Sequence, residues 1–87
     1  MRFQDLKFDK DKRYALGKDV QDHCYYLSIP VRNSRIEYEE YYQLTDKLYS
    51  DFMNNPSEAD RFAKECRQRL HDDLLILSPG IERGEPA

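Results

Sequence analysis

The sequence predicts an α+β domain in which an antiparallel sheet is covered on one face by two helices. Apolar and aromatic residues alternate with polar ones across residues 24–44, on both sides of a short polar turn, which is typical of a β-hairpin. After Leu44 the apolar period lengthens to about 3.6 residues, which indicates helices. Strands followed by helices, rather than a strict alternation of the two, favour an α+β arrangement.

The first 22 residues predict two short strands. The first covers about residues 3–8, a charged turn follows at 9–12, and the second strand covers about 14–16 and ends near Gly17. Residues 18–23 are polar and predict a connection into the hairpin.

The hairpin predicts two faces of different character. We place its turn at residues 32–35 with Arg32 opposite Arg35, so that residues facing one another share a side of the sheet. The core face then carries apolar and aromatic side chains: Tyr25, Leu27, Ile29, Val31, Ile36, Tyr38 and Tyr42. The other face is acidic and rich in tyrosine: Tyr26, Ser28, Pro30, Glu37, Glu39 and Tyr41. Glu40 falls on the core face opposite Leu27, so it lies at the sheet edge, pairs with a basic residue, or is re-aimed by a bulge.

Two helices are predicted after the hairpin. Thr45 can cap a helix over about 46–54, which ends before Pro56 because the residue before a proline is disfavoured in the α region. Ser57 and Asp60 have the spacing of a capping box for a second helix over about 58–71. Its apolar stripe follows helical spacing and consists of Ala59, Phe62, Ala63, Cys66 and Leu70.

The end of the chain predicts a short buried strand at about 74–77, because a run of four apolar residues lies between acids and a Ser-Pro-Gly turn. Residues 1–80 are expected to form one domain. Residues 81–87 are expected to be a flexible tail.

Composition limits the classes of protein to consider. The 87 residues are 39% hydrophobic and 36% charged, with two cysteines, which is too few for a disulfide scaffold. No apolar stretch approaches the roughly 18 residues that span a membrane, and the first residues lack the apolar core of a secretory signal. We therefore expect a cytoplasmic protein with free thiols.

Acidic residues are concentrated in one region. The net charge is −3, but residues 33–60 hold seven carboxylates against two cations. Residues 61–71 are basic, as on a solvated helix surface, and a nucleic-acid footprint should extend beyond one helix. We therefore expect no nucleic acid as a partner.

Catalytic and metal sites are incomplete. His71-Asp72-Asp73 could act in proton transfer, but only His23 could join it, so a helix end is the better interpretation. Cys24 and Cys66, with the two histidines, have the wrong spacing for structural zinc. No nucleophile has an adjacent base, and no glycine-rich loop is present. The sequence predicts no enzyme activity, no metal and no cofactor.

The acidic hairpin face remains as a candidate protein-binding surface. Its simplest interpretation is an ordinary exposed sheet face, where tyrosines and carboxylates keep the sheet soluble. Tyrosine is nevertheless enriched at interface hot spots, and carboxylates beside it would match a basic partner.

The segments Tyr25–Val31, Ile36–Tyr42 and His71–Ile76 together resemble a small family of bacterial proteins. The size and acidic character are similar to those of immunity proteins of polymorphic-toxin and contact-dependent growth inhibition systems. The resemblance covers about residues 24–80 and implies binding and neutralisation of a toxin domain, often a basic nuclease. The toxin-facing residues that it implies are Tyr26, Glu37, Glu39 and Tyr41, with Asp46 and Asp51 as rim charges. The alternative is a small regulatory or scaffold protein that binds another partner or self-associates.

Overall fold

The α+β fold is confirmed by a computed structural model, which describes residues 2–78 and 83–86. The sheet is antiparallel, in the order β1-β2-β3-β4, and its strands are β1 (Phe3–Asp9), β2 (Tyr14–Asp19), β3 (Cys24–Arg32) and β4 (Glu37–Leu44). The elements that follow are α1 (Asp46–Asn54), α2 (Pro56–Arg67), a 3-10 turn η1 (Asp72–Leu74) and β5 (Glu85–Pro86). The two strands predicted before residue 22 are present as β1 and β2.

The core lies between one face of the sheet and the two helices. Leu27, Ile29 and Val31 point from β3 into this core and are almost completely buried. Phe52 of α1 and Phe62 of α2 meet them from the helix side, with ring centroids 5.2 Å apart. Burial of a side chain of this size contributes about 1.5–3 kcal/mol, so this layer is the main source of stability.

The hairpin register differs by two residues from the prediction. Arg32 lies opposite Glu37 rather than Arg35, and Ile29 lies opposite Glu40. The cause is the turn: the Asn33 side-chain oxygen accepts hydrogen bonds from the backbone N–H groups of Arg35 and Ile36, at 2.8 and 2.9 Å. This Asx turn lengthens the loop to four residues. A shift of two residues keeps the strand side chains on their predicted faces. Ile36, predicted on the core face, instead lies in the loop before β4 and is 60% exposed.

The first predicted helix is confirmed as α1, whose N-terminus is capped by Thr45 accepting from the Leu48 N–H at 3.1 Å. The second predicted helix is present as α2, but both of its ends differ from the predicted range of about 58–71. Helix α2 begins at Pro56, and the Ser57 hydroxyl donates to the Asn55 side chain rather than capping the helix.

Helix α2 ends at Arg67 rather than near residue 71, because Arg69 adopts a left-handed conformation (φ 62°). The N–H groups of Arg69 and Leu70 return to the carbonyls of Cys66 and Glu65, which is a Schellman motif with arginine in the usual glycine position. Leu70, predicted on the apolar stripe, is consequently 61% exposed.

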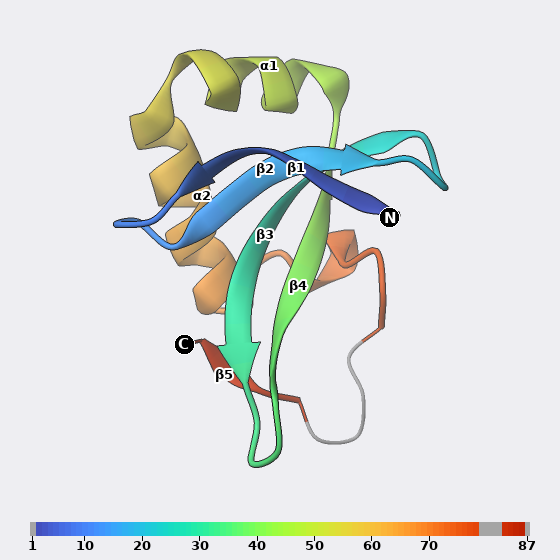
Figure 1. The fold of residues 1–87 in the computed structure, drawn as a ribbon. Coiled ribbons are helices and arrows are strands. Elements are labelled where there is room, and N and C mark those ends of the chain that lie inside the picture. The colour runs from blue at the N-terminus through green and yellow to red at the C-terminus, as the bar shows by residue number, and fades with distance from the viewer. Residues whose placement is uncertain (1, 79–82, 87) are drawn as a thin grey trace.

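The C-terminal region departs most from the predictions. Residues 74–77 do not form a strand: η1 is followed by a single bridge between Leu75 and Tyr42 of β4. Residues 83–86 were expected in a flexible tail, but β5 instead pairs with β3 at Val31 and Arg32. It occupies the part of the β3 edge beyond the end of β2, as Figure 1 shows. The predicted domain boundary at residue 80 lies outside the described residues.

The sheet coils strongly, so the β1–β2 hairpin runs steeply across β3 and β4 (Figure 1). Gly17 of β2 has no side chain, so the Gln4 carbonyl and the Tyr26 side chain can lie close to its backbone on the face away from the helices. A Cβ atom there would lie 2.2 Å from the Gln4 carbonyl oxygen and 2.5 Å from the Tyr26 hydroxyl. Because of this coiling, Phe3 of β1 packs against Tyr26 and Tyr41, on the face of the hairpin that was predicted to be acidic and rich in tyrosine.

Candidate functional site

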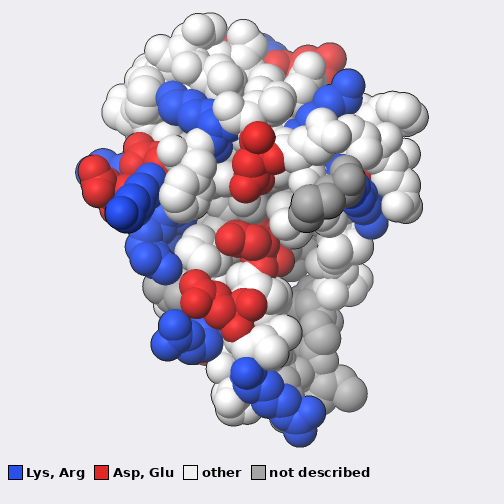
Figure 2. All heavy atoms as spheres, viewed as in Figure 1, with Lys and Arg blue, Asp and Glu red and all other residues white. Residues whose placement is uncertain are grey.

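The face of the sheet away from α1 and α2, called here the uncovered face, carries four of the six predicted partner-binding residues, and three of them reach its surface. Glu37, Glu39 and Tyr41 alternate along β4 and point to this side, because the residues between them face the core. Glu37 and Glu39 are exposed, and Tyr41 is half-buried. Figure 2 shows acidic side chains in a column over β3 and β4, with basic side chains on its flanks.

Tyr26 shares this face but does not reach the surface. Its side chain is completely buried beneath Phe3 and Tyr41, whose rings meet it edge to face at centroid distances of 5.6 and 4.9 Å. Its hydroxyl donates to the Asp5 carboxylate at 2.5 Å. Burial and this hydrogen bond raise the pKa of Tyr26 well above its usual value. The predicted role of Tyr26 as a contact residue is therefore replaced by a structural one: it positions Asp5 and Tyr41.

Phe3 and Tyr41 form a stacked aromatic pair on the uncovered face. Their ring centroids are 3.7 Å apart and the rings are nearly parallel, with an interplanar angle of 9°. The Arg2 guanidinium lies 4.8 Å from the Phe3 centroid, in cation–π geometry. The stack restricts both aromatic side chains and connects β1 with β4, the first and last strands in the order β1-β2-β3-β4.

Glu39 lies in an unfavourable electrostatic environment. Partial burial raises its pKa, and the neighbouring carboxylates of Asp5 and Glu37 raise it further, while Arg13 acts in the opposite direction. Within residues 2–78 and 83–86, the Glu39 carboxylate has no hydrogen bond or ion pair. Among the described residues, the negative charge of Glu39 therefore has more carboxylate than cation neighbours.

Glu37, two residues away, is better compensated. Its carboxylate lies 3.3 Å from the Arg32 guanidinium and 3.8 Å from that of Arg13. All three side chains are substantially exposed, so these ion pairs contribute little to stability. A partner protein could therefore replace these ion pairs with its own at a small cost in free energy. We call Phe3, Asp5, Glu37, Glu39 and Tyr41 the acidic face.

Asp46 and Asp51 do not belong to the acidic face. Both are exposed on α1, in the helix layer on the other side of the sheet. Asp51 accepts a hydrogen bond from Lys47 at 2.8 Å and lines a cavity of about 340 Å³ between α1 and α2. The six predicted residues thus divide into three on the acidic face, two on the helix layer and the buried Tyr26.

The sequence interpretation missed Phe3 and Asp5. They precede the hairpin by about 20 residues, and only the coiling of the sheet brings them over it. Their alternation on β1 was the available signal, because residues two apart on a strand share a face.

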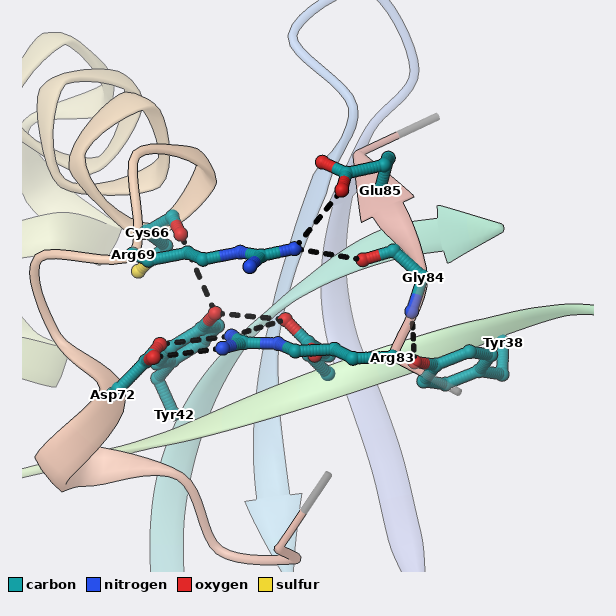
Figure 3. Close-up of polar contacts among 9 residues, drawn as sticks. Tyr38, Tyr42, Cys66, Arg69, Asp72, Arg83, Gly84 and Glu85 are labelled. Carbon is teal, nitrogen blue, oxygen red and sulfur yellow. Dashed lines mark hydrogen bonds and ion pairs between the residues drawn. The ribbon is translucent and has the colours of Figure 1, made fainter. Parts of the chain in front are cut away.

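Glu40 lies on the core face and pairs with a basic residue, which was one of the three alternatives for it. Arg83 binds both Glu40 oxygens, at 2.9 and 3.2 Å, and both Asp72 oxygens, at 2.7 and 2.8 Å (Figure 3). The Tyr42 hydroxyl also donates to Glu40, at 3.0 Å. Hydrogen bonding to Arg83 lowers the pKa of Asp72.

The segment that carries Arg83 is held by further contacts. The Gly84 N–H donates to the Tyr38 hydroxyl at 2.7 Å, and Arg69 donates to the Gly84 carbonyl and to Glu85 (Figure 3). A Cβ atom at Gly84 would lie only 2.7–2.9 Å from the backbone of Arg32. This network is part of the fold and leaves Arg83 unavailable to a ligand.

The residues considered for catalysis and for zinc binding make contacts within the fold. His71 stacks on Phe62 with centroids 4.3 Å apart and lies 2.8 Å from a Glu65 oxygen. Cys24 and Cys66 are free thiols, and burial raises the pKa of Cys66 far above its usual value. Residues 2–78 and 83–86 contain no cluster of three or more His, Cys, Asp or Glu side chains placed to hold a metal ion.

Comparison with known proteins finds no matching family model, no matching curated protein and no matching solved structure. Neither α1 nor α2, nor any other helix in the described residues, has the length and apolar character required to span a lipid bilayer. The geometry of the acidic face is therefore the main basis for a functional proposal.

Proposed function

We propose that the chain is a non-enzymatic protein-binding module that uses its acidic face to bind a positively charged protein. More specifically, it is an immunity protein of a bacterial toxin system, which neutralises a basic toxin domain such as a nuclease in the cytoplasm. The observation that carries the proposal is the set of three exposed carboxylates on the acidic face, Asp5, Glu37 and Glu39, of which Glu39 has no ion pair within residues 2–78 and 83–86.

Like charges held together weaken the isolated protein, because their repulsion is relieved only by a counter-charge. A lysine or arginine from a partner would supply that charge, and arginine would also stack on the exposed part of Tyr41. Fixed aromatic side chains beside the carboxylates add apolar contact area at low entropic cost. Complementary charges also accelerate association, which suits an inhibitor that must act before its toxin does.

Capture experiments with charge-reversed variants test this proposal. The chain is immobilised, incubated with lysate of its native host, and the bound proteins are identified by mass spectrometry. We expect a basic protein, and expect Glu37→Lys with Glu39→Lys to abolish its capture, with a melting temperature close to that of the wild type. Stability should change little, because relief of the repulsion among Asp5, Glu37 and Glu39 opposes the loss of the exposed ion pairs of Glu37 with Arg32 and Arg13.

Asp46→Lys with Asp51→Lys is the matched comparison, because it makes the same charge change on the helix layer. Capture that survives this pair but not the β4 pair supports the acidic face. Capture lost with the helix pair alone would move the interface to α1. Capture unaffected by the β4 pair would refute the proposed face.

A further inference from the structure

The outer edge of β1 exposes large apolar side chains that the acidic face does not use. β1 is the last strand in the sheet order, so no strand among residues 2–78 and 83–86 covers its outer edge. Leu6 is 55% exposed and Phe8 is 63% exposed. An edge strand with exposed apolar residues is a template for pairing with another strand.

The residues on either side of Phe8 have opposite charges. Lys7 faces Leu16 and Asp9 faces Tyr14 across the β1–β2 ladder, so both lie on the helix side of the sheet. Phe8 faces Ala15 and lies on the uncovered side. An identical strand added antiparallel about Phe8 would place Lys7 opposite Asp9 of the second copy, twice, on one face. On the other face the two phenyl rings would meet.

We infer that two copies of this chain associate through antiparallel pairing of their β1 edges, with the two-fold axis at Phe8. A dimer of this kind uses the same surface on both copies, as a closed two-fold interface requires. Opposite charges and an aromatic pair directly across an antiparallel ladder both stabilise it.

The bulge at Leu6 explains why the axis lies at Phe8 rather than at Leu6. The β1–β2 register shifts between Asp5 and Lys7, which puts Asp5 on the uncovered side and Lys7 on the helix side. In a dimer with its axis at Leu6, Asp5 of one copy would lie opposite Lys7 of the other. The two side chains would point to opposite faces of the sheet, so their charges could not interact. The bulge also restricts regular pairing to a few residues, so the dimer is weak and reversible.

The two-fold axis is perpendicular to the sheet at β1, so the uncovered sides of both copies point the same way. The dimer would present two acidic faces to one side. This inference concerns the chain alone and does not rest on the proposed function, since self-association is measured without any partner.

Sedimentation velocity of the purified full chain, from micromolar to millimolar concentration, tests the inference. We expect a concentration-dependent dimer whose dissociation constant rises about tenfold in Lys7→Glu, because two attractions become two repulsions. Lys18→Glu makes the same charge change on β2, away from the outer edge, and should leave the constant unchanged.

Cross-linking tests the position of the axis. In a Cys24→Ser background, Phe8→Cys should form a disulfide-linked dimer on mild oxidation, because residues opposite one another lie about 4.5–5.5 Å apart at Cα. Lys18→Cys should remain monomeric under the same conditions. A chain that stays monomeric at millimolar concentration would overturn the inference, as would a dimer that Lys7→Glu and Lys18→Glu weaken equally.

Discussion

Arg83→Met should destabilise the fold strongly, although Arg83 lies only four residues before the last residue, Ala87. The substitution keeps the apolar stem and removes the guanidinium that binds Glu40 and Asp72. The Glu40 side chain is only 6% exposed and would keep only the Tyr42 hydroxyl as a partner. A carboxylate left buried without its cation is the main cost.

Removal of one partner of a buried ion pair typically costs about 3–5 kcal/mol. The Arg83 side chain is 16% exposed, so water can reach part of the site and we expect about 2–4 kcal/mol. In a domain of this size 1 kcal/mol corresponds to about 4–8 °C in melting temperature, so the expected loss is about 8–32 °C. Thermal unfolding followed by circular dichroism measures it.

Two comparison variants separate the ion pair from general loss of packing. Asp72→Asn removes the more exposed acid, whose side chain is 41% exposed, and should cost less than about 1 kcal/mol. Arg83→Met combined with Glu40→Leu removes both charges and should recover at least half of the lost stability. A shift of only a few degrees for Arg83→Met, or a double variant no more stable than the single one, would refute this reasoning.

Three further predictions concern pH and close packing. Burial raises the pKa of Tyr26 and of Tyr42, so their contribution is complete below about pH 10 and is lost as pH rises above it. Urea unfolding at pH 8–11 should show this fall, and Tyr26→Phe should reduce its slope. Hydrogen bonding to Arg2 lowers the pKa of Asp19, so its contribution is present above about pH 4 and lost as pH falls further. Asp19→Asn should flatten the acid limb of the same stability curve. Gly17→Ala should cost about 1–3 kcal/mol in urea unfolding, because its new methyl group would overlap a backbone carbonyl of β1.

Local chemistry made much of the fold predictable. The alternation in the hairpin assigned the residues of β3 and β4 to the correct faces but failed for Ile36 in the loop, and Thr45 marked the start of α1. The register was wrong because a single side chain, Asn33, makes the turn two residues longer than the shortest hairpin loop. The end of α2 was wrong because Arg69 takes a conformation that usually signals glycine.

Long-range contacts were not predictable from these patterns. Arg83 reaches Glu40 across 43 residues, and nothing near either residue in the sequence indicates the pair. Tyr26 and Asp5 are 21 residues apart and meet only because the sheet coils. For the same reason the sequence placed Tyr26 on the binding surface, whereas the structure buries it beneath Phe3.

Glu39 and Glu40 are neighbours in β4 and differ in how their charges are compensated. Glu40 points into the core, where the chain supplies Arg83 from its own C-terminal segment and Tyr42 as a second donor. Glu39 points to the uncovered face, is also partly desolvated, and has two carboxylates rather than a cation as its strongest electrostatic neighbours. Within residues 2–78 and 83–86, the fold thus gives the buried carboxylate a direct cation partner and leaves the adjacent one at the surface without an ion pair. A cation from another protein would complete the second site as Arg83 completes the first, which is why we look for the partner of this chain among basic proteins.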